Sequence, residues 1–187
     1  LPLADIQIPG VHNIENYMAA IAAVDGIVPD RCVRAVAQRF TGVEHRIELV
    51  RELDGVRYYN DSIGTSPTRT MACLDSFEQK LILIAGGYDK GVPFTQLGMA
   101  VTEKVKVLIL TGDTAPAIKK AVEEAEGYAE SGLKLIEADD LASAVATARE
   151  IAQKGDVVVL SPACAAFDRF KNFMERGKVF KQLVNEL

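Results

Sequence analysis

The chain has 187 residues, of which 49% are hydrophobic, and a formal net charge of -5 at neutral pH. This length and apolar content suffice for one substantial core and part of another. The acidic balance argues against a general binder of nucleic acid or membrane surfaces, and no apolar run is long enough to cross a bilayer. Three widely spaced cysteines without a C-x-x-C pair are typical of reduced thiols, so we expect a cytoplasmic protein with no signal peptide.

The N-terminal part of the chain has helical patterns only. Apolar periodicity predicts one helix over residues 13–24, which is rich in alanine, and a second over 30–40. Thr41-Gly42 follows the second helix and is interpreted as a hinge. Because the chain begins with Leu1 and with an element already in progress, we interpret it as a piece of a longer protein.

From Ile47 onward, apolar runs of strand length alternate with helical patterns. The predicted strands are 47–50, 56–59, 80–84, 105–110, 134–136 and 156–160. The predicted helices lie near 67–74, 94–102, 116–126, 141–153 and 167–184. Three of the strands are apolar throughout, as strands covered on both faces must be. The pattern predicts an α/β fold, a Rossmann-like doubly wound and mostly parallel sheet flanked by helices, preceded by a partial helical segment.

A polar corner stands between the second predicted strand and the helix that follows it. Within residues 58–68, an aromatic run ends in small polar residues and Pro67 then opens the helix. Asp61 can accept hydrogen bonds from ribose hydroxyls, Ser62 and Thr65 offer hydroxyl groups, and the N-terminus of the helix favours anions. An ordinary capped loop is the alternative, since these residue types are also common caps.

Further blocks accompany this corner along the chain. They are Gly10–Asn16, Gly42–Arg46, Gly86–Gly91 and Leu160–Asp168. In this order and at these intervals, the blocks resemble those of the Mur ligase family of peptidoglycan synthesis. The corner motif N-D-S-x-x-T, the run S-P-A-C-A and the later block Asn172–Gly177 are most similar to the members that add D-glutamate. The resemblance covers nearly the whole chain. It implies that residues 1–42 are the tail of a central ATP-binding domain and residues 43–187 a C-terminal Rossmann-like glutamate-ligase domain.

The resemblance also implies a reaction. The members that add D-glutamate use ATP to activate the carboxylate of UDP-N-acetylmuramoyl-L-alanine as an acyl phosphate, which the amine of D-glutamate then attacks. The two small molecules are the expected partners, ATP and magnesium the expected cofactors, and the protein is expected to be a monomer. No G-x-x-x-x-G-K-(S/T) loop occurs in this chain, so we expect the catalytic residues and magnesium ligands elsewhere in the full protein and no activity from this piece alone.

Four residues are the candidate ATP contacts. By resemblance, Asn13 and Asn16 reach the adenine and nearby groups of the nucleotide, and Asp61 contacts the ribose. Arg46 follows the hinge directly, where a guanidinium is suited to clamp phosphate in a two-pronged way. The alternatives are helix capping for the two asparagines and a surface salt bridge for Arg46. His45, the neighbour of Arg46, is interpreted as a packed residue.

Five residues are the candidate D-glutamate contacts. Lys90 follows a double glycine at a strand end, where the backbone can turn tightly. By resemblance, Lys90 holds the side-chain carboxylate with Thr65 beside it, and the other carboxylate meets N–H groups near Ala166 and Phe167 and the backbone of Phe173. Without the resemblance, Lys90 would be read as a solvated lysine. The helical spacing of the phenylalanines in 167–173 predicts that their rings pack in the core.

Two positions depart from the pattern of the family. Ile63 stands where many of these ligases have a lysine near the nucleotide, and Ala166 replaces a common serine. Lineage variation and altered substrate choice both explain such changes. Two other functions remain as alternatives, a related amide ligase of the folylpolyglutamate synthetase type and a non-catalytic Rossmann-like binding module.

Overall fold

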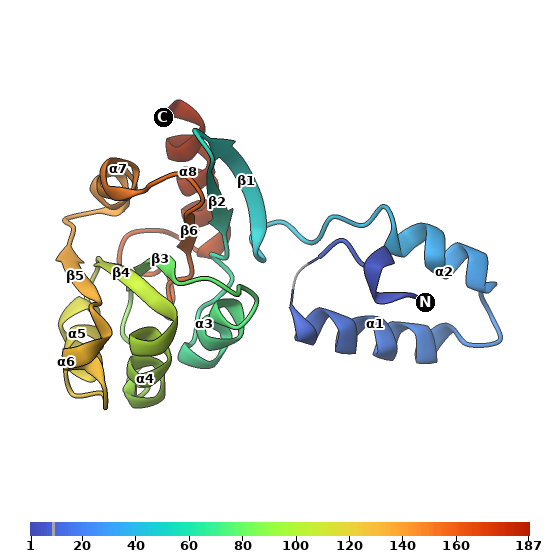
Figure 1. Ribbon diagram of the computed structural model, residues 1–187, viewed down its shortest axis with the longest axis horizontal. Helices are drawn as coiled ribbons and strands as arrows, with labels where there is room; N and C mark the ends of the chain where they lie inside the picture. The colour runs from blue at the N-terminus through green and yellow to red at the C-terminus, as the bar shows by residue number, and fades with distance from the viewer. Residues whose placement is uncertain (9) are drawn as a thin grey trace. The chain divides into compact units, whose positions relative to one another are not determined.

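The computed structural model describes residues 1–8 and 10–187, apart from the side chain of His12. The chain divides into two compact units, Leu1–Glu44 and His45–Leu187. Helices alone make up the first unit, and the second holds a complete sheet with helices on both faces (Figure 1). The described residues contain no helix that is both long and apolar enough to span a membrane.

The first unit consists of the 3-10 helix η1 (Leu3–Asp5) and the α-helices α1 (Val11–Val24) and α2 (Asp30–Ala37). Both predicted α-helices are confirmed, although α2 ends three residues earlier than expected, in a turn closed by Phe40 N–H and Val36 O at 2.8 Å. An ion pair of 2.7 Å between Arg34 and Asp5 ties α2 to η1. Among the described residues of this unit, only Asn13 and Ala37 are buried, so the unit has little core of its own.

The second unit is built on a six-stranded sheet in the order β1-β2-β6-β3-β4-β5. The strands are β1 (Glu48–Leu53), β2 (Val56–Asn60), β3 (Leu81–Ala85), β4 (Val105–Leu110), β5 (Lys134–Glu137) and β6 (Val157–Leu160). β1 pairs with β2 in antiparallel fashion, and every other pairing is parallel. The predicted mostly parallel, doubly wound sheet is therefore confirmed.

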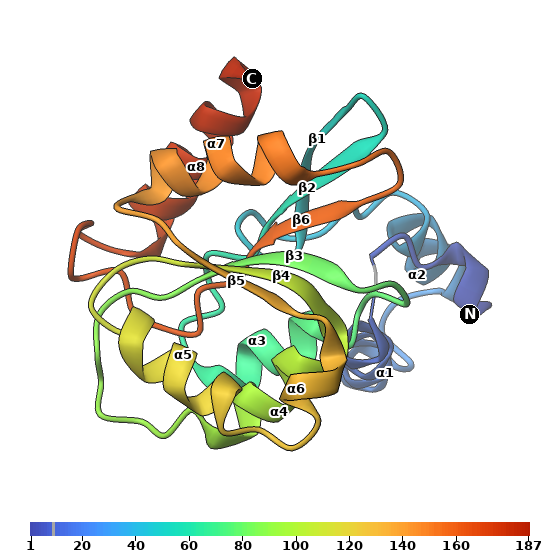
Figure 2. The ribbon, with the colours of Figure 1, turned by 60° about the vertical axis from the view of Figure 1, so that its left-hand side comes forward.

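Helices cover both faces of this sheet (Figure 2). They are α3 (Pro67–Leu74), α4 (Thr95–Lys104), α5 (Ala115–Glu123), α6 (Tyr128–Ser131), α7 (Leu141–Ile151) and α8 (Phe173–Glu186). Alternate residues of β3 pack on opposite sides: Leu81 and Leu83 join the core under α3, α4 and α5, while Ile82 and Ile84 join the core under α7 and α8. All four side chains are fully buried, which explains why this strand is apolar throughout.

Two helices differ from the prediction. The four-residue helix α6 was not expected; it lies between Gly127 and Gly132, which both have positive φ. The last helix begins at Phe173 rather than near residue 167, because the Asn172 side chain caps it by accepting from Glu175 N–H at 2.9 Å. Residues 166–170 form a single separate turn, and Phe167 is 64% exposed. The predicted core packing of the Phe167 ring is therefore wrong, because this residue precedes the helix.

The turns that follow the parallel strands gather at one edge of the sheet, as predicted. β6 lies between β2 and β3, so the carboxyl ends of these three strands are neighbours. At the end of β3 the backbone passes so close to the next turn that a Cβ on Gly86 would lie 1.9 Å from the Thr111 carbonyl oxygen. With a φ of 115°, this position requires glycine. The edge where doubly wound folds bind ligands is thus tightly packed at its base.

Candidate functional site

Hydrogen bonds join the three segments that leave the neighbouring strand ends. Asp61 N–H donates to Leu160 O at 2.8 Å, which links the ends of β2 and β6. Gly86 N–H donates to Pro162 O at 2.8 Å, and Tyr88 N–H donates to Ala165 O at 3.0 Å, which links the segment after β3 to the segment after β6. The candidate residues on these segments therefore belong to one continuous surface of the second unit.

The Asp61 carboxyl group is at the base of this surface, where the residue is only 4% exposed. Oδ2 accepts from the Ser161 hydroxyl at 2.7 Å, and Oδ1 accepts from Ile47 N–H at 3.3 Å. Burial raises the pKa of Asp61 to about 6, against the opposing effects of these two donors, the Cys73 thiol and the charge of Arg46. A carboxylate has about four acceptor positions, so the donors from Ser161, Ile47 and Cys73 leave one acceptor position of Asp61 unused.

Arg46 lies in a strained segment beside Asp61. His45 and Ile47, on either side of it, have φ values of 67° and 44°, which are unusual for residues with a β-carbon and most of all for isoleucine. The segment is held by Ile63 N–H, which donates to His45 O at 3.2 Å, and by the bond between Ile47 N–H and Asp61. Arg46 itself is half-buried. The structure thus brings the candidate phosphate and ribose contacts of the second unit into one corner.

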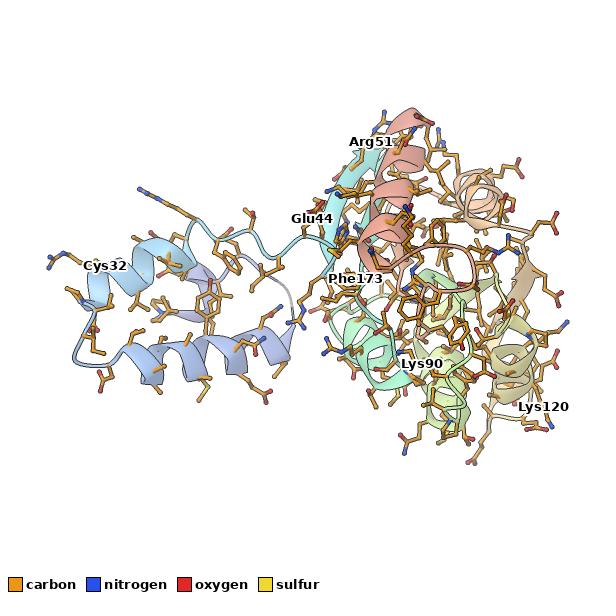
Figure 3. All side chains as sticks on the ribbon, turned by 180° about the vertical axis from the view of Figure 1, so that it is seen from behind. Cys32, Glu44, Arg51, Lys90, Lys120 and Phe173 are labelled. Atoms are coloured by element: carbon orange, nitrogen blue, oxygen red, sulfur yellow. The ribbon has the colours of Figure 1, made fainter. Side chains whose placement is uncertain are left out.

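Lys90 reaches across the surface to the same corner. Its ammonium Nζ donates to the carbonyl oxygen of Thr65 at 2.7 Å, and the lysine is exposed. The loop that carries Lys90 is anchored by an isolated bridge between Tyr88 and Ala165, and the Tyr88 ring meets the Phe167 ring edge to face at 6.1 Å. Lys90, Thr65 and the segment with Ala166 and Phe167 therefore lie close together. Lys120, another lysine of this unit, lies at the opposite end of the unit from Phe173 (Figure 3).

The N–H groups near Ala166 and Phe167 do not form the N-terminus of the long helix. They belong to the single turn in which Phe170 N–H donates to Ala166 O at 2.8 Å, and Ala166 itself is 2% exposed. The N-terminus of the long helix lies instead at Phe173, directly after the Asn172 cap. The Phe173 carbonyl oxygen accepts from the Ser62 hydroxyl at 2.7 Å, so this helix end also reaches the polar corner.

Arg176 is a central residue of the site to which the sequence assigned no role. The guanidinium is 3% exposed and donates to Ser62 Oγ at 3.0 Å, Ser62 O at 3.0 Å, Cys164 O at 3.0 Å and Ala165 O at 3.1 Å. Burial lowers the pKa of Arg176 to about 10. The side chain ties α8 to the segments after β2 and β6. Arg176 belongs to the sequence block Asn172–Gly177, which could have marked it as a site residue, but only the fold shows which segments it joins.

His45 is a packed residue, in agreement with the interpretation of the sequence. It is 3% exposed, and its Nδ1 accepts from the Asn60 side-chain amide at 2.9 Å. Glu48 accepts from both His45 N–H at 2.9 Å and Asn60 Nδ2 at 3.1 Å. A Cβ on Gly177 would lie 2.3 Å from His45 Nδ1, so the glycine lets α8 approach the ring. This arrangement braces the backbone beside Arg46.

Asn13 and Asn16 lie on the first turn and a half of α1, in the first unit. Asn16 Nδ2 donates to Asn13 Oδ1 at 3.3 Å, and Asn13 is 6% exposed whereas Asn16 is exposed. The pair is thus organised within its own helix, and its nucleotide contacts remain a prediction.

Solved structures share the fold of this chain. Folylpolyglutamate synthase of Mycobacterium tuberculosis, complexed with ADP, matches with a TM-score of 0.68 and 14% identity over 95% of this chain and 41% of that one. A pseudomurein peptide ligase type C from Methanothermus fervidus matches with a TM-score of 0.65 and 14% identity over 95% of this chain and 36% of that one. The chain therefore shares its fold, including the mostly parallel sheet, with these two solved structures.

The family follows from the sequence itself. Residues 45–164 match the Mur ligase, glutamate ligase domain, and the chain belongs to this family. It is 54% identical over 186 residues to the UDP-N-acetylmuramoylalanine–D-glutamate ligase of Acetivibrio thermocellus and 52% identical over 184 residues to that of Ruminiclostridium cellulolyticum. These alignments cover 98% and 97% of the chain but 40% of each relative, so the chain spans about two fifths of their length. The resemblance seen in the sequence motifs is thereby confirmed.

Proposed function

We propose that this chain is part of the ATP-dependent ligase that joins D-glutamate to UDP-N-acetylmuramoyl-L-alanine in peptidoglycan precursor synthesis. Within it, residues 43–187 are the C-terminal domain that closes over the nucleotide and brings in D-glutamate, and residues 1–42 are the tail of the central ATP-binding domain. The names of relatives about half identical over nearly the whole chain support the reaction. The division of the chain into compact units at Glu44 and His45 supports the boundary.

One observation carries the assignment of D-glutamate to this unit: the 2.7 Å contact between Lys90 Nζ and Thr65 O at the ligand edge. D-glutamate differs from smaller amino acids mainly in its second carboxylate, so selectivity needs a cation directed at that group. Lys90 is exposed and held beside Thr65, where it can exchange part of its hydration for a carboxylate. The backbone N–H groups around Ala166, Phe167 and Phe173 take the other carboxylate, as uncharged donors that need no serine hydroxyl at position 166.

The nucleotide contacts follow the same edge. The residues that would hold ATP are Asp61 at the ribose, Arg46 at the phosphates, and Asn13 and Asn16 at the adenine. ATP supplies the phosphoryl group that activates the carboxylate of the nucleotide sugar. Magnesium and the catalytic residues belong to the part of the protein outside this chain. The 187-residue chain alone should therefore show no magnesium-dependent phosphate release above a heat-killed control.

An amino-acid panel assay on the full-length protein tests the proposal. With ATP and UDP-N-acetylmuramoyl-L-alanine, D-glutamate should give product, while L-glutamate, D-aspartate and L-lysine should give little. L-Glutamate with a folate acceptor tests the folylpolyglutamate synthetase alternative in the same assay. Product with the folate acceptor alone would favour that alternative, and no product with any acceptor would favour a binding module.

A further inference from the structure

We propose that Ser161 is a positioning residue for Asp61: its hydroxyl, braced by Thr70, holds the carboxylate in the orientation that meets the ribose of the nucleotide. This inference rests on the nucleotide role proposed above for Asp61. It concerns a side chain that follows a different strand, one hundred residues further along the chain.

The sheet makes Asp61 and Ser161 neighbours. β2 and β6 pair in parallel with Asn60 opposite Leu160, so the residues that follow these two leave the sheet side by side. The Ser161 hydroxyl is 2.7 Å from Asp61 Oδ2, and Ser161 is fully buried. A hydroxyl bound to a carboxylate at this distance and away from water is a strong, charge-assisted hydrogen bond.

Thr70 contacts Ser161 at two points and braces it. Thr70 is fully buried in α3, and its hydroxyl is 3.0 Å from Ser161 Oγ and 3.3 Å from the Ser161 carbonyl oxygen. Ser161 has one hydroxyl proton, and the ionised carboxylate is the strongest acceptor within its reach. The Ser161 hydroxyl therefore donates to Asp61, while Thr70 donates to the Ser161 carbonyl oxygen and holds the serine in place from the other side.

The surroundings prevent the carboxylate from turning away. A Cβ on Gly64 would lie 2.6 Å from Asp61 Oδ2 and 2.8 Å from Ser161 Oγ, so the backbone at Gly64 packs directly over the pair. On the other side, Ile47 N–H donates to Asp61 Oδ1 at 3.3 Å. Both oxygens of the carboxylate are thus fixed by the protein before any ligand arrives, which is the preorganisation that favours binding.

The same hydrogen bond keeps Asp61 charged. Burial raises the pKa of Asp61 to about 6, and the Ser161 hydroxyl opposes this rise more than Ile47 N–H, the Cys73 thiol or the charge of Arg46 does. The residues that face the carboxylate are therefore one cation, one thiol and uncharged donors. Without the Ser161 hydroxyl, a larger share of Asp61 would be protonated at neutral pH.

The first test is a carboxyl titration by 13C NMR on the 187-residue chain, which needs no nucleotide. Ser161→Ala should raise the titration midpoint of Asp61 by roughly one pH unit, and Thr70→Val should raise it by less. Thr102→Val is the matched control, because Thr102 is a buried threonine of α4 whose hydroxyl donates to Gly98 O at 2.9 Å. An unchanged midpoint in Ser161→Ala would overturn the inference.

The second test measures nucleotide use by the full-length protein. Ser161→Ala should raise the KM for ATP and weaken ADP binding in calorimetry by about ten-fold at pH 7, leave the KM for D-glutamate unchanged, and recover part of the loss at pH 8.5. If Ser161 had only a structural role, the loss of nucleotide affinity would not recover at the higher pH.

If Ser161→Ala fails to fold, the same measurements on Thr70→Val test the inference, since valine keeps the shape of threonine. Asp61→Asn separates the two claims: no effect of Asp61→Asn on ATP use refutes its nucleotide role, whereas an effect of Asp61→Asn without one of Ser161→Ala refutes only the inference.

Discussion

Asp61 and Lys90 lie at the same edge of one sheet, but the protein holds their charges in opposite ways. Asp61 is 4% exposed and accepts hydrogen bonds from Ser161 and Ile47, whereas Lys90 is exposed and donates to the carbonyl oxygen of Thr65. The first charge is fixed by the fold, and the second is free to exchange water for a ligand. In the function proposed above, the fixed charge at the base meets the nucleotide and the exposed lysine meets D-glutamate, so variants at the two residues should affect different substrates.

The largest effect is expected at the packed base of the Lys90 loop. Gly86→Ala should destabilise the chain by more than about 3 kcal/mol, because the new Cβ would meet the Thr111 carbonyl oxygen at 1.9 Å. Gly91→Ala is the matched control at the loop tip: nothing lies within 4 Å and only its φ of 69° opposes the change, so about 1 kcal/mol is expected. Urea unfolding of both variants measures this contrast. Equal losses of unfolding free energy in the two variants would mean that the base of the loop is no more tightly packed than its tip.

The buried charge of Asp61 should appear in the pH dependence of stability. Its folded pKa, about 6, lies above the ordinary value of 3.8, so the folded chain holds this proton more tightly than the unfolded chain. The stabilisation is complete below about pH 4 and is lost as the pH rises through 6, a change of about 3 kcal/mol. The free energy of unfolding of the wild type minus that of Asp61→Asn should fall by this amount from pH 4 to pH 7. A difference that does not change with pH would show that the pKa of Asp61 is not raised in the folded chain.

Asp61→Asn should also weaken ATP use in the full-length protein while D-glutamate affinity stays nearly the same. A charge-assisted hydrogen bond is worth roughly 1.5–3 kcal/mol, or about ten- to a hundred-fold in the KM for ATP. Steady-state kinetics with each substrate varied in turn give the comparison. If the KM for ATP did not change, Asp61 would have no place in the nucleotide site.

The sequence predicts much of this edge because the carboxyl ends of parallel strands must meet. That rule alone brings Asp61 and the Lys90 loop to one surface, and the apolar runs fix the strands that carry them. The order of the strands in the sheet cannot be read from the local sequence. The pattern of strands and helices would also allow β6 on the other side of β3, and only its position between β2 and β3 makes Ser161 a partner of Asp61. The role of Arg176 could not be predicted either, because it also depends on β2 and β6 being neighbours.

A helix cap explains why the predicted start of the last helix was wrong. The spacing of the phenylalanines suggested a helix from residue 167, but the Asn172 cap sets its start at Phe173. A single turn before the cap leaves Phe167 exposed beside Tyr88. The domain boundary and the roles of the site residues remain predictions, since they depend on ligands and on the rest of the protein.

We expect Lys90 to recognise the side-chain carboxylate of D-glutamate, and steady-state kinetics of Lys90→Ala in the full-length protein measure this role. The KM for D-glutamate should rise by about ten-fold or more, far beyond any change for ATP or UDP-N-acetylmuramoyl-L-alanine. Lys120→Ala is the control, because Lys120 is an exposed lysine of the same unit that pairs with Glu124 at 3.8 Å. It should leave all three constants unchanged. Equal losses for all three substrates in Lys90→Ala, or no loss for D-glutamate, would contradict the assignment.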